Sequence, residues 1–381
     1  MEKIRIGDAC ELLNGFAFKS ENYVKEGIRI IRIANVQKGY IEDNTPAFYP
    51  ADSEGLDKYM LEENDLLMSL TGNVGRVAIL QKDMLPAALN QRVACLRLKT
   101  DRITKGYLFH LLNSDFFEQK CIQSSKGVAQ KNMSTEWLKD FLIPVYSVEK
   151  QQEITTTLDN LRDIINKRKQ ELNKLDDLIK ARFVELFGDP SLNTKGYPIK
   201  SLPEIAEYWN GLTYKPENVA DEGTIVLRSS NIQNAQLDFE DTVRVTCSIG
   251  EKKYVQDNDI LMCSRNGSAR LVGKVALIKN IEEPMSFGAF MMIIRSQYYP
   301  YLITFFQMPA FRAQIATGAT TTINQITGRM LDNVKLPVPD KTELDNFISF
   351  IEQVDKSKVV VQKALDEAHL LFDSLMQEYF E

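Results

Sequence analysis

Histidine and cysteine, on which many catalytic and metal sites depend, are scarce in this 381-residue sequence. Its two histidines, His110 and His369, both lie within apolar helical patterns, so we expect them to be satisfied side chains on helix faces. Its five cysteines are scattered without C-x-x-C spacing, which is typical of reduced thiols in a cytoplasm. The sequence therefore predicts no disulfide framework and no metal site.

Long apolar runs and recognised catalytic motifs are also missing. No stretch approaches the roughly twenty apolar residues that span a membrane, and the N-terminus lacks the basic start and apolar run of a secretory signal. The motifs G-x-x-x-x-G-K-[ST], H-E-x-x-H and G-x-S-x-G do not occur. Neither does the Asn-Pro-Pro segment that an S-adenosylmethionine methyltransferase would need. We therefore predict that the chain is not an enzyme and binds no cofactor itself.

A long helical pattern is the clearest feature that is present. Over residues 147–189, apolar side chains recur in alternating steps of four and three, the heptad seam of a coiled coil, with Arg168 as a polar break. Ser147 is the expected N-cap, and Gly188 followed by Pro190 predicts the end. About forty helical residues span about 60 Å, and such a seam needs a partner helix. The predicted seam positions are Ile154, Leu158, Leu161, Ile165, Leu172, Leu175 and Ile179.

A second pattern of the same kind, over residues 340–380, supplies that partner. Asp340 and Glu343 predict a reciprocal cap at its start, and Lys358 is its polar break. A shift of 193 residues lays the first pattern on the second, and it also lays an Ile-Pro-Val segment on a Leu-Pro-Val segment just before each helix. The sequence is therefore an internal repeat. The predicted seam positions here are Phe347, Ile351, Val354, Val361, Leu365, Phe372 and Leu375.

The segments that precede the two helices are related as well. A β-branched run at residues 27–37 ends in an Arg, an Asn and a Gln, and so does the run at residues 223–233. Asp-Leu-Leu-Met-Ser at 65–69 corresponds to Asp-Ile-Leu-Met-Cys at 259–263. Turn signals recur about every ten residues, which is typical of a strand-rich domain with only short helices.

We therefore predict an α+β fold with two pseudo-repeated globular domains, separated by a pair of long antiparallel coiled-coil helices. The predicted order is a globular domain at 1–147, a helix at 148–189, a second globular domain at 190–338 and a second helix at 339–381. Antiparallel pairing would place the two globular domains at opposite ends of the helix pair.

Polar loops with glycine, arginine and amide side chains interrupt both globular segments. One reading is that their glycines form hairpin turns and their arginines are solvated. The other is that they meet DNA, because Arg, Lys, Asn, Gln and Thr read base edges in the major groove. The loops differ between the two copies, whereas the surrounding segments are similar. A protein that recognises two different DNA sequences would require this. The net charge of −6 decides nothing, because residues 339–381 alone hold 4 Lys and Arg against 10 Asp and Glu.

Over essentially its whole length the chain resembles the specificity (S) subunit of a type I restriction-modification enzyme. The residues that carry the resemblance are LIPV at 142–145 with EKQQEI at 149–154, ARFVELFGD at 181–189, TGNVGR at 71–76 and ALNQRV at 88–93. The second copy departs from that pattern. It lacks the glutamine pair at 341–344, and its glycine loop is rearranged.

The resemblance implies a non-catalytic reader of double-stranded DNA in a bacterial or archaeal cytoplasm. Two target-recognition domains would each read one half of a bipartite target, and the two helices would fix the spacing between the halves. Two methyltransferase (M) subunits would bind the helical region and supply adenine methylation with S-adenosylmethionine. Restriction (R) subunits, with ATP and Mg²⁺, would join in some complexes. No membrane partner is implied.

Candidate DNA-binding residues lie on the loops of both predicted target-recognition domains. In the first domain they are Arg32, Asn35, Asn73, Arg76, Lys126, Gln130, Lys131 and Asn132. In the second they are Arg228, Asn231, Arg265, Asn266, Arg270, Lys274, Thr320, Thr321, Thr322, Asn324 and Gln325. The alternative interpretation is a coiled-coil scaffold or adaptor without sequence-specific DNA binding.

Overall fold

The structure of the protein is a computed structural model that describes residues 2–124, 133–233, 235–316 and 324–380. The chain divides into two compact units. The first unit contains Met1–Lys169 together with Gln362–Glu381, and the second contains Gln170–Val361. Each unit therefore combines one globular part with a portion of each long helix.

The two long helices are α5 (Val148–Phe187) and α9 (Lys341–Phe380), each of 40 residues. Ser147 caps α5, since its Oγ accepts a hydrogen bond of 3.2 Å from the backbone N–H of Lys150. Gly188 ends α5 with a φ of 75°, a left-handed conformation that glycine adopts without strain.

The cap of α9 is only half of the reciprocal arrangement predicted from the sequence. Asp340 Oδ1 accepts a hydrogen bond of 2.9 Å from the Glu343 N–H, as expected. The Glu343 carboxylate does not return to the cap, because its Oε1 accepts instead from the Tyr197 hydroxyl at 2.7 Å. The expectation of a full capping box is therefore wrong for this helix.

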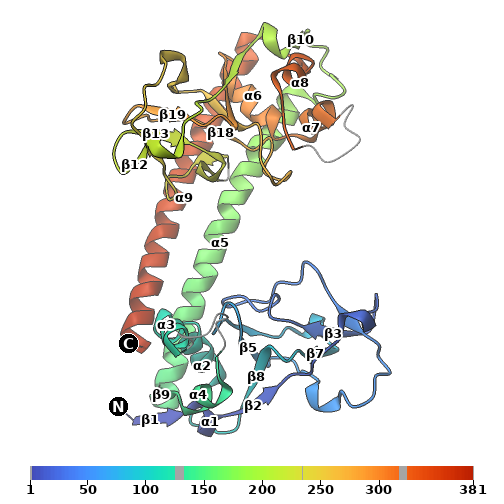
Figure 1. The fold of residues 1–381 in the computed structure, drawn as a ribbon, viewed down its shortest axis with the longest axis vertical. Helices are drawn as coiled ribbons and strands as arrows, with labels where there is room; N and C mark the ends of the chain where they lie inside the picture. The colour runs from blue at the N-terminus through green and yellow to red at the C-terminus, as the bar shows by residue number, and fades with distance from the viewer. Residues whose placement is uncertain (1, 125–132, 234, 317–323, 381) are drawn as a thin grey trace. The chain divides into compact units, whose positions relative to one another are not determined.

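The long helices pair antiparallel, as the contacts within each unit demonstrate (Figure 1). In the first unit, Ile154 near the start of α5 shares a core with Phe380 at the end of α9. In the second unit, Phe183 near the end of α5 packs edge-on against Phe347 near the start of α9, with ring centroids 5.7 Å apart. The predicted antiparallel helix pair is confirmed.

A polar residue in the seam of α9 has a partner on α5. Lys358 is largely buried, and its ammonium group forms an ion pair with Asp176 in the second unit. This contact accounts for one of the two breaks in the apolar pattern. Arg168, the other break, is half-buried on α5.

The first globular part consists of two small sheets and short helices. A four-stranded antiparallel sheet has the order β2-β8-β5-β6, and a three-stranded sheet has the order β4-β3-β7 with β3 and β7 parallel. Strands β1 and β9 form a separate pair. The strands are β1 (Glu2–Arg5), β2 (Cys10–Asn14), β3 (Ile28–Ile31), β4 (Phe48–Tyr49), β5 (Leu66–Ser69), β6 (Val77–Ile79), β7 (Ala87–Leu89), β8 (Val93–Leu98) and β9 (Leu142–Val145). The helices are α1 (Ile6–Ala9), α2 (Lys105–Leu112), α3 (Asp115–Ser124) and α4 (Thr135–Asp140).

The second globular part repeats this topology. Its main sheet has the order β11-β20-β17-β18, its second sheet the order β12-β16-β13-β19, and β10 pairs with β21. The strands are β10 (Ile199–Ser201), β11 (Glu207–Asn210), β12 (Val219–Ala220), β13 (Thr224–Leu227), β14 (Ile232–Gln233), β15 (Gln236–Leu237), β16 (Arg244–Val245), β17 (Ile260–Cys263), β18 (Val275–Leu277), β19 (Met285–Phe287), β20 (Met291–Arg295) and β21 (Lys335–Pro337). The helices are α6 (Tyr299–Phe306), α7 (Pro309–Ala316) and α8 (Gly328–Asp332).

Each main sheet is buried on both faces because its central strand alternates between two cores. In the first unit, Leu66 and Met68 face a core shared with the helices, whereas Leu67 faces a core shared with β3 and β7. In the second unit, Ile260 faces the core shared with the helices, whereas Leu261 faces the core shared with β13 and β19. The predicted α+β fold with an internal repeat is thereby confirmed in topology and in packing.

Candidate nucleic-acid interface

The loop that follows β3, and its counterpart after β13, is built around a buried asparagine. Asn35 is 3% exposed and Asn231 is fully buried. The Asn35 Oδ1 accepts from the Arg32 N–H at 2.9 Å, and its amide nitrogen donates to the Glu42 carbonyl at 2.8 Å. Asn231 makes the same local contact with the Arg228 N–H at 2.8 Å. These two predicted DNA-binding residues hold their loops together, and their amides are fully engaged inside the protein.

The arginines of the same loops are also engaged. The Arg32 guanidinium donates to the Thr45 carbonyl, and Arg228 forms an ion pair of 2.8 Å with Asp241. Both side chains are half-buried. Each arginine thus contributes at least one of its guanidinium donors to holding its own loop.

The glycine loop between β5 and β6 has the turn geometry expected from its sequence. Gly72 and Gly75 have φ angles of 71° and 85°. Arg76, which follows the turn, donates to the side chain of Gln37. Asn73 is exposed beside it, and its amide oxygen lies 3.1 Å from Arg76 Nη2 in the orientation that satisfies both groups. The turn thus presents an amide and a guanidinium side by side.

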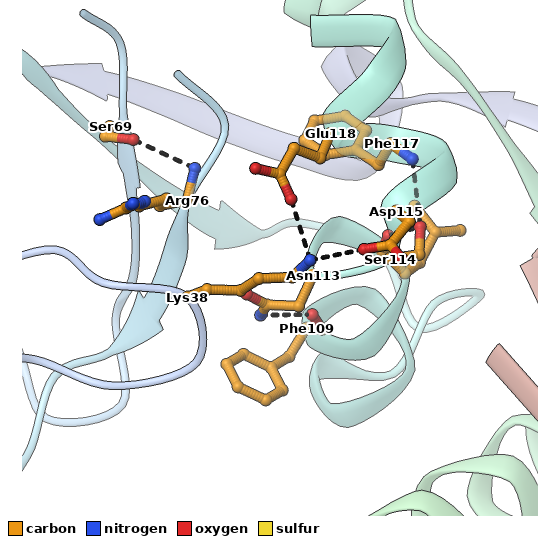
Figure 2. Close-up of polar contacts among 10 residues, drawn as sticks. Lys38, Ser69, Arg76, Phe109, Asn113, Ser114, Asp115, Phe117 and Glu118 are labelled. Atoms are coloured by element: carbon orange, nitrogen blue, oxygen red, sulfur yellow. Dashed lines mark hydrogen bonds and ion pairs between the residues drawn. The ribbon is translucent and has the colours of Figure 1, made fainter. Parts of the chain in front are cut away.

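A lysine next to this turn is neutralised by helix α3 (Figure 2). The ammonium of Lys38 lies 2.7 Å from Asp115 and 2.9 Å from Glu118. Burial lowers the pKa of Lys38, but the hydrogen bonds to the two carboxylates outweigh it, so that the pKa lies above the usual value. The contacts fasten the loop after β3 to α3, and they leave Lys38 poorly placed to bind phosphate.

Among the predicted cations that the structure describes, the most accessible lie on the glycine loop between β17 and β18. Arg265 and Arg270 are both exposed, and Gly273 turns the chain with a φ of 78°. Lys274 occupies the place of Arg76 in the repeat and points inward, with its ammonium 3.4 Å from the Ile232 carbonyl. Lys274 therefore binds within the protein at this turn, whereas Arg265 and Arg270 are exposed to solvent.

Several segments of the second unit meet at this turn. Asn266 donates from its side chain to the Ser229 hydroxyl at 3.0 Å and from its backbone N–H to the Asn324 carbonyl at 3.4 Å. Arg265 and Gln325 form an isolated β-bridge. Asn324 and Gln325 are both exposed. The structure thus brings Arg265, Asn266, Asn324 and Gln325 together on one polar surface, which we call the second-unit loop surface.

Seven predicted residues lie outside the described residues. They are Lys126, Gln130, Lys131, Asn132, Thr320, Thr321 and Thr322. The chain re-enters the described region at equivalent places, because the Met133 N–H donates to the Leu70 carbonyl at 2.9 Å and the Ile326 N–H donates to the Ser264 carbonyl at 2.7 Å. Both polar loops therefore end beside the glycine turn of their own unit.

Sequence reasoning did not select two residues of this neighbourhood, Phe290 and Arg92. Each precedes the strand that pairs with the glycine-loop strand, and both are exposed. The Arg265 guanidinium carbon lies over the Phe290 ring, 5.4 Å from its centroid. Phe290 stands in the apolar run MSFGAFMMII, so the sequence offered no signal that its side chain is exposed.

Burial and hydrogen bonding account for the surroundings of several cysteines and of His110. All five cysteines are free thiols, and burial raises the pKa of Cys10 and Cys121 to about 12, far from the range of a reactive thiolate. His110 is buried and lies 2.9 Å from Asp159, which agrees with the satisfied histidine expected from the sequence. Within the described ranges, His, Cys, Asp and Glu side chains do not gather in any group of three that could hold a metal ion. A search of the same ranges finds no helix that is long and apolar enough to cross a membrane.

Two solved structures from type I restriction-modification systems share this fold. The S subunit of a type I restriction-modification system from M. genitalium aligns over 100% of this chain and 96% of its own, with a TM-score of 0.55 and 15% identity. A chain from work on complex assembly and conformational transition of the type I R-M system aligns over 100% of this chain and 97% of its own, with a TM-score of 0.58 and 16% identity. These likenesses establish the fold.

Sequence comparison finds relatives of the same kind. Residues 1–174 match the family of the type I restriction modification DNA specificity domain. Over 99% of this chain and 85% of its own length, the EcoBI specificity subunit of Escherichia coli is 22% identical. The EcoKI specificity subunit of Escherichia coli K12 is 23% identical over 98% of this chain and 86% of its own length. Residues 1–174 thus match the type I DNA specificity domain family, and the resemblance to specificity subunits drawn from the sequence is confirmed.

The comparisons also bear on the alternative interpretation of the whole chain, a coiled-coil scaffold or adaptor. A role in DNA sequence recognition is supported, and a coiled-coil scaffold without sequence preference is not favoured.

Proposed function

We propose that this chain reads a bipartite DNA sequence, one half with residues 1–147 and the other with residues 190–338. The observation that carries the proposal is the repeated framework, whose equivalent loops present different side chains in the two units. At the glycine turn, for example, Asn73 and Arg76 in the first unit contrast with Arg265 and Arg270 in the second. Two dissimilar readers on one scaffold would recognise an asymmetric target.

The proposed DNA contacts lie at the two glycine turns and in the two polar loops outside the described residues. In the first unit these are Asn73 and Arg76, together with the loop at 125–132. In the second they are the residues of the second-unit loop surface with Arg270 and the loop at 317–323. The buried Asn35 and Asn231 are left out, because their side chains are surrounded by protein. Arg32, Arg228 and Lys274 would act chiefly by holding the loops in place.

The helix pair would set the distance between the two half-sites. Helix α5 runs through 40 residues without interruption and so does α9, and an antiparallel apolar seam resists sliding and bending. Dimeric DNA readers fix half-site spacing by a rigid separator of the same kind. In this chain the separator and both readers would belong to a single polypeptide.

Methylation and cleavage would be carried out by other subunits. The chain would direct two adenine methyltransferase subunits, which bind S-adenosylmethionine, and restriction subunits that use ATP and Mg²⁺ where they are present. Such a complex would work on DNA in the cytoplasm of a bacterium or archaeon. The exposed apolar side chains Val359, Val360 and Leu370 on α9 suit a partner surface on the helical region.

The test is a comparison of DNA methylation in cells with and without the gene. We expect a gene-dependent methyladenine motif with two specified halves and an unspecified spacer. A chain that has no sequence preference would leave the methylome unchanged, and the proposal would then fail. The purified chain alone should neither bind S-adenosylmethionine nor methylate DNA, and methylation by the chain alone would contradict its role as a non-catalytic reader.

A further inference from the structure

Phe290 and Arg92 occupy the same position of the repeated framework. In the second unit Cys263 of β17 pairs with Met291 of β20, and in the first unit Ser69 of β5 pairs with Val93 of β8. One residue further out, the Ser264 N–H donates to the Phe290 carbonyl at 2.9 Å, and the Leu70 N–H donates to the Arg92 carbonyl at 3.0 Å. The backbone is thus equivalent, and only the side chain differs.

The Phe290 side chain is exposed on a rigid support. Its ring is 59% exposed although the next residue, Met291, is 1% exposed. Its carbonyl accepts three hydrogen bonds, from the Ser264 N–H and hydroxyl at 2.9 Å each and from the Arg265 N–H at 3.1 Å. The loop is therefore held in place, and the ring stands at the edge of the second-unit loop surface.

The surroundings of Phe290 are suited to DNA. The Arg265 guanidinium lies 5.4 Å from the ring centroid, and Arg265 is bridged to the exposed Gln325. A cation and an amide thus flank an apolar side chain. In the major groove the apolar feature that distinguishes one base pair from another is the 5-methyl group of thymine, and phenylalanine is among the side chains that contact it.

Resting on the proposed function, we infer that Phe290 is a specificity-determining residue that contacts the 5-methyl group of a thymine in the half-site read by residues 190–338. Arg265 beside it positions the ring and meets a neighbouring phosphate or base edge. Arg92 takes the equivalent position against the other half-site, where a guanidinium selects a guanine instead.

The experiment uses the full chain in complex with its methyltransferase subunits and the motif found in the wild-type methylome. Phe290→Ala should relax one position in one half of the motif and leave the other half unchanged. Replacing the contacted thymine by deoxyuridine should weaken binding of the wild-type complex about fourfold, the free energy of one buried methyl group. The Phe290→Ala complex should show no such loss, because the contact is already absent.

Matched variants define the outcomes. Phe239, an exposed phenylalanine of the same unit that lies between Asp238 and Glu240, serves as the control, and Phe239→Ala should keep the wild-type motif. Arg92→Ala should relax the opposite half of the motif. If Phe290→Ala keeps both the motif and the response to deoxyuridine, the inference is wrong while the proposed function stands. If the wild-type chain produces no bipartite motif, both are overturned.

Discussion

Arg97 on β8 donates two hydrogen bonds, of 2.8 and 2.7 Å, to the two carboxylate oxygens of Asp65, the residue before β5. Arg295 and Asp259 repeat this bidentate pair in the second unit, with both hydrogen bonds at 2.7 Å. The hydrogen bonds to Asp65 raise the pKa of Arg97 above its usual range. Each pair joins two central strands at the end opposite the glycine turn.

Asp65→Asn should destabilise the first unit. Asp65 is 6% exposed, and removal of its charge leaves the guanidinium of Arg97, 28% exposed, with only the exposed Glu62 carboxylate, 3.2 Å away, as a counterion. Breaking such a pair costs about 3 kcal/mol. The chain offers a reporter for each unit, because its two tryptophans are Trp137 and Trp209. Urea unfolding of a Trp209→Phe background should show a lower midpoint for Asp65→Asn.

The matched change in the second unit is Asp259→Asn, followed by Trp209 in a Trp137→Phe background. It should lower the Trp209 midpoint by a similar amount, because the geometry of the two pairs is the same. A midpoint that stays the same in either unit would mean that the ion pair contributes no net stability. An equal response of both reporters to a single mutation would indicate that the units unfold together.

The pair between Lys358 and Asp176 predicts a charge-swap experiment on the helix seam. Lys358→Asp should place two carboxylates together and destabilise the second unit by about 2 kcal/mol, within the range of coupled neighbours. Adding Asp176→Lys should restore most of the loss. Lys356, exposed on the same helix, is the control, and Lys356→Asp should change the Trp209 urea midpoint little. If the double variant is no more stable than Lys358→Asp, the two side chains do not interact in solution.

The helix pair and the duplicated topology could be predicted from the sequence because both leave regular traces in it. Heptad spacing depends only on which residues are apolar, and a repeat appears as a constant shift. The partner of Lys358 was not predictable, because it depends on how α5 and α9 are aligned along each other. The prediction of a full capping box on α9 was wrong for a similar reason. The hydroxyl of Tyr197, which comes from another segment of the chain, donates a hydrogen bond to the Glu343 carboxylate.

The candidate site was less predictable than the fold. Asn35 and Asn231 lie in polar sequence that predicts exposure. In the structure a later segment of the chain covers each of them, and the backbone carbonyls of Glu42 and Asp238 accept hydrogen bonds from their side-chain amides. Phe290 sits in an apolar stretch that predicts burial, and only the end of the strand ladder exposes it. Local patterns reveal which residues are polar. Whether a polar residue reaches the surface depends on which distant segments of the chain fold over it.

Arg270→Ala tests the electrostatic part of DNA binding. Arg270 is exposed on the second-unit glycine loop, and a phosphate contact there would release about one counterion. The variant complex should bind all DNA sequences more weakly and reduce the slope of log K against log salt by about 0.9. Lys279→Ala is the control, because Lys279 is already paired with Asp355 at 2.9 Å. A slope that Arg270→Ala leaves unchanged would remove Arg270 from the proposed contacts.

Matched insertions in the two long helices test whether they set the half-site spacing. Because Asp176 meets Lys358 and the helices are antiparallel, Leu172, one turn before Asp176, faces the turn of α9 that contains Val361. One heptad inserted after each of Leu172 and Val361 keeps the apolar seam continuous. It lengthens the helix pair by about 10 Å, the equivalent of about three base pairs.

Three base pairs also rotate the duplex by about 100°, so the spacer that fits best balances the added length against this rotation. We therefore expect the methylation motif to keep both halves and to gain about one to three base pairs of spacer. The same heptad inserted in α5 alone should abolish the motif, because the pairing of Ile154 with the end of α9 and of Phe183 with Phe347 could not then be satisfied together. An unchanged spacer in the doubly extended chain would contradict the role of the helices as a ruler.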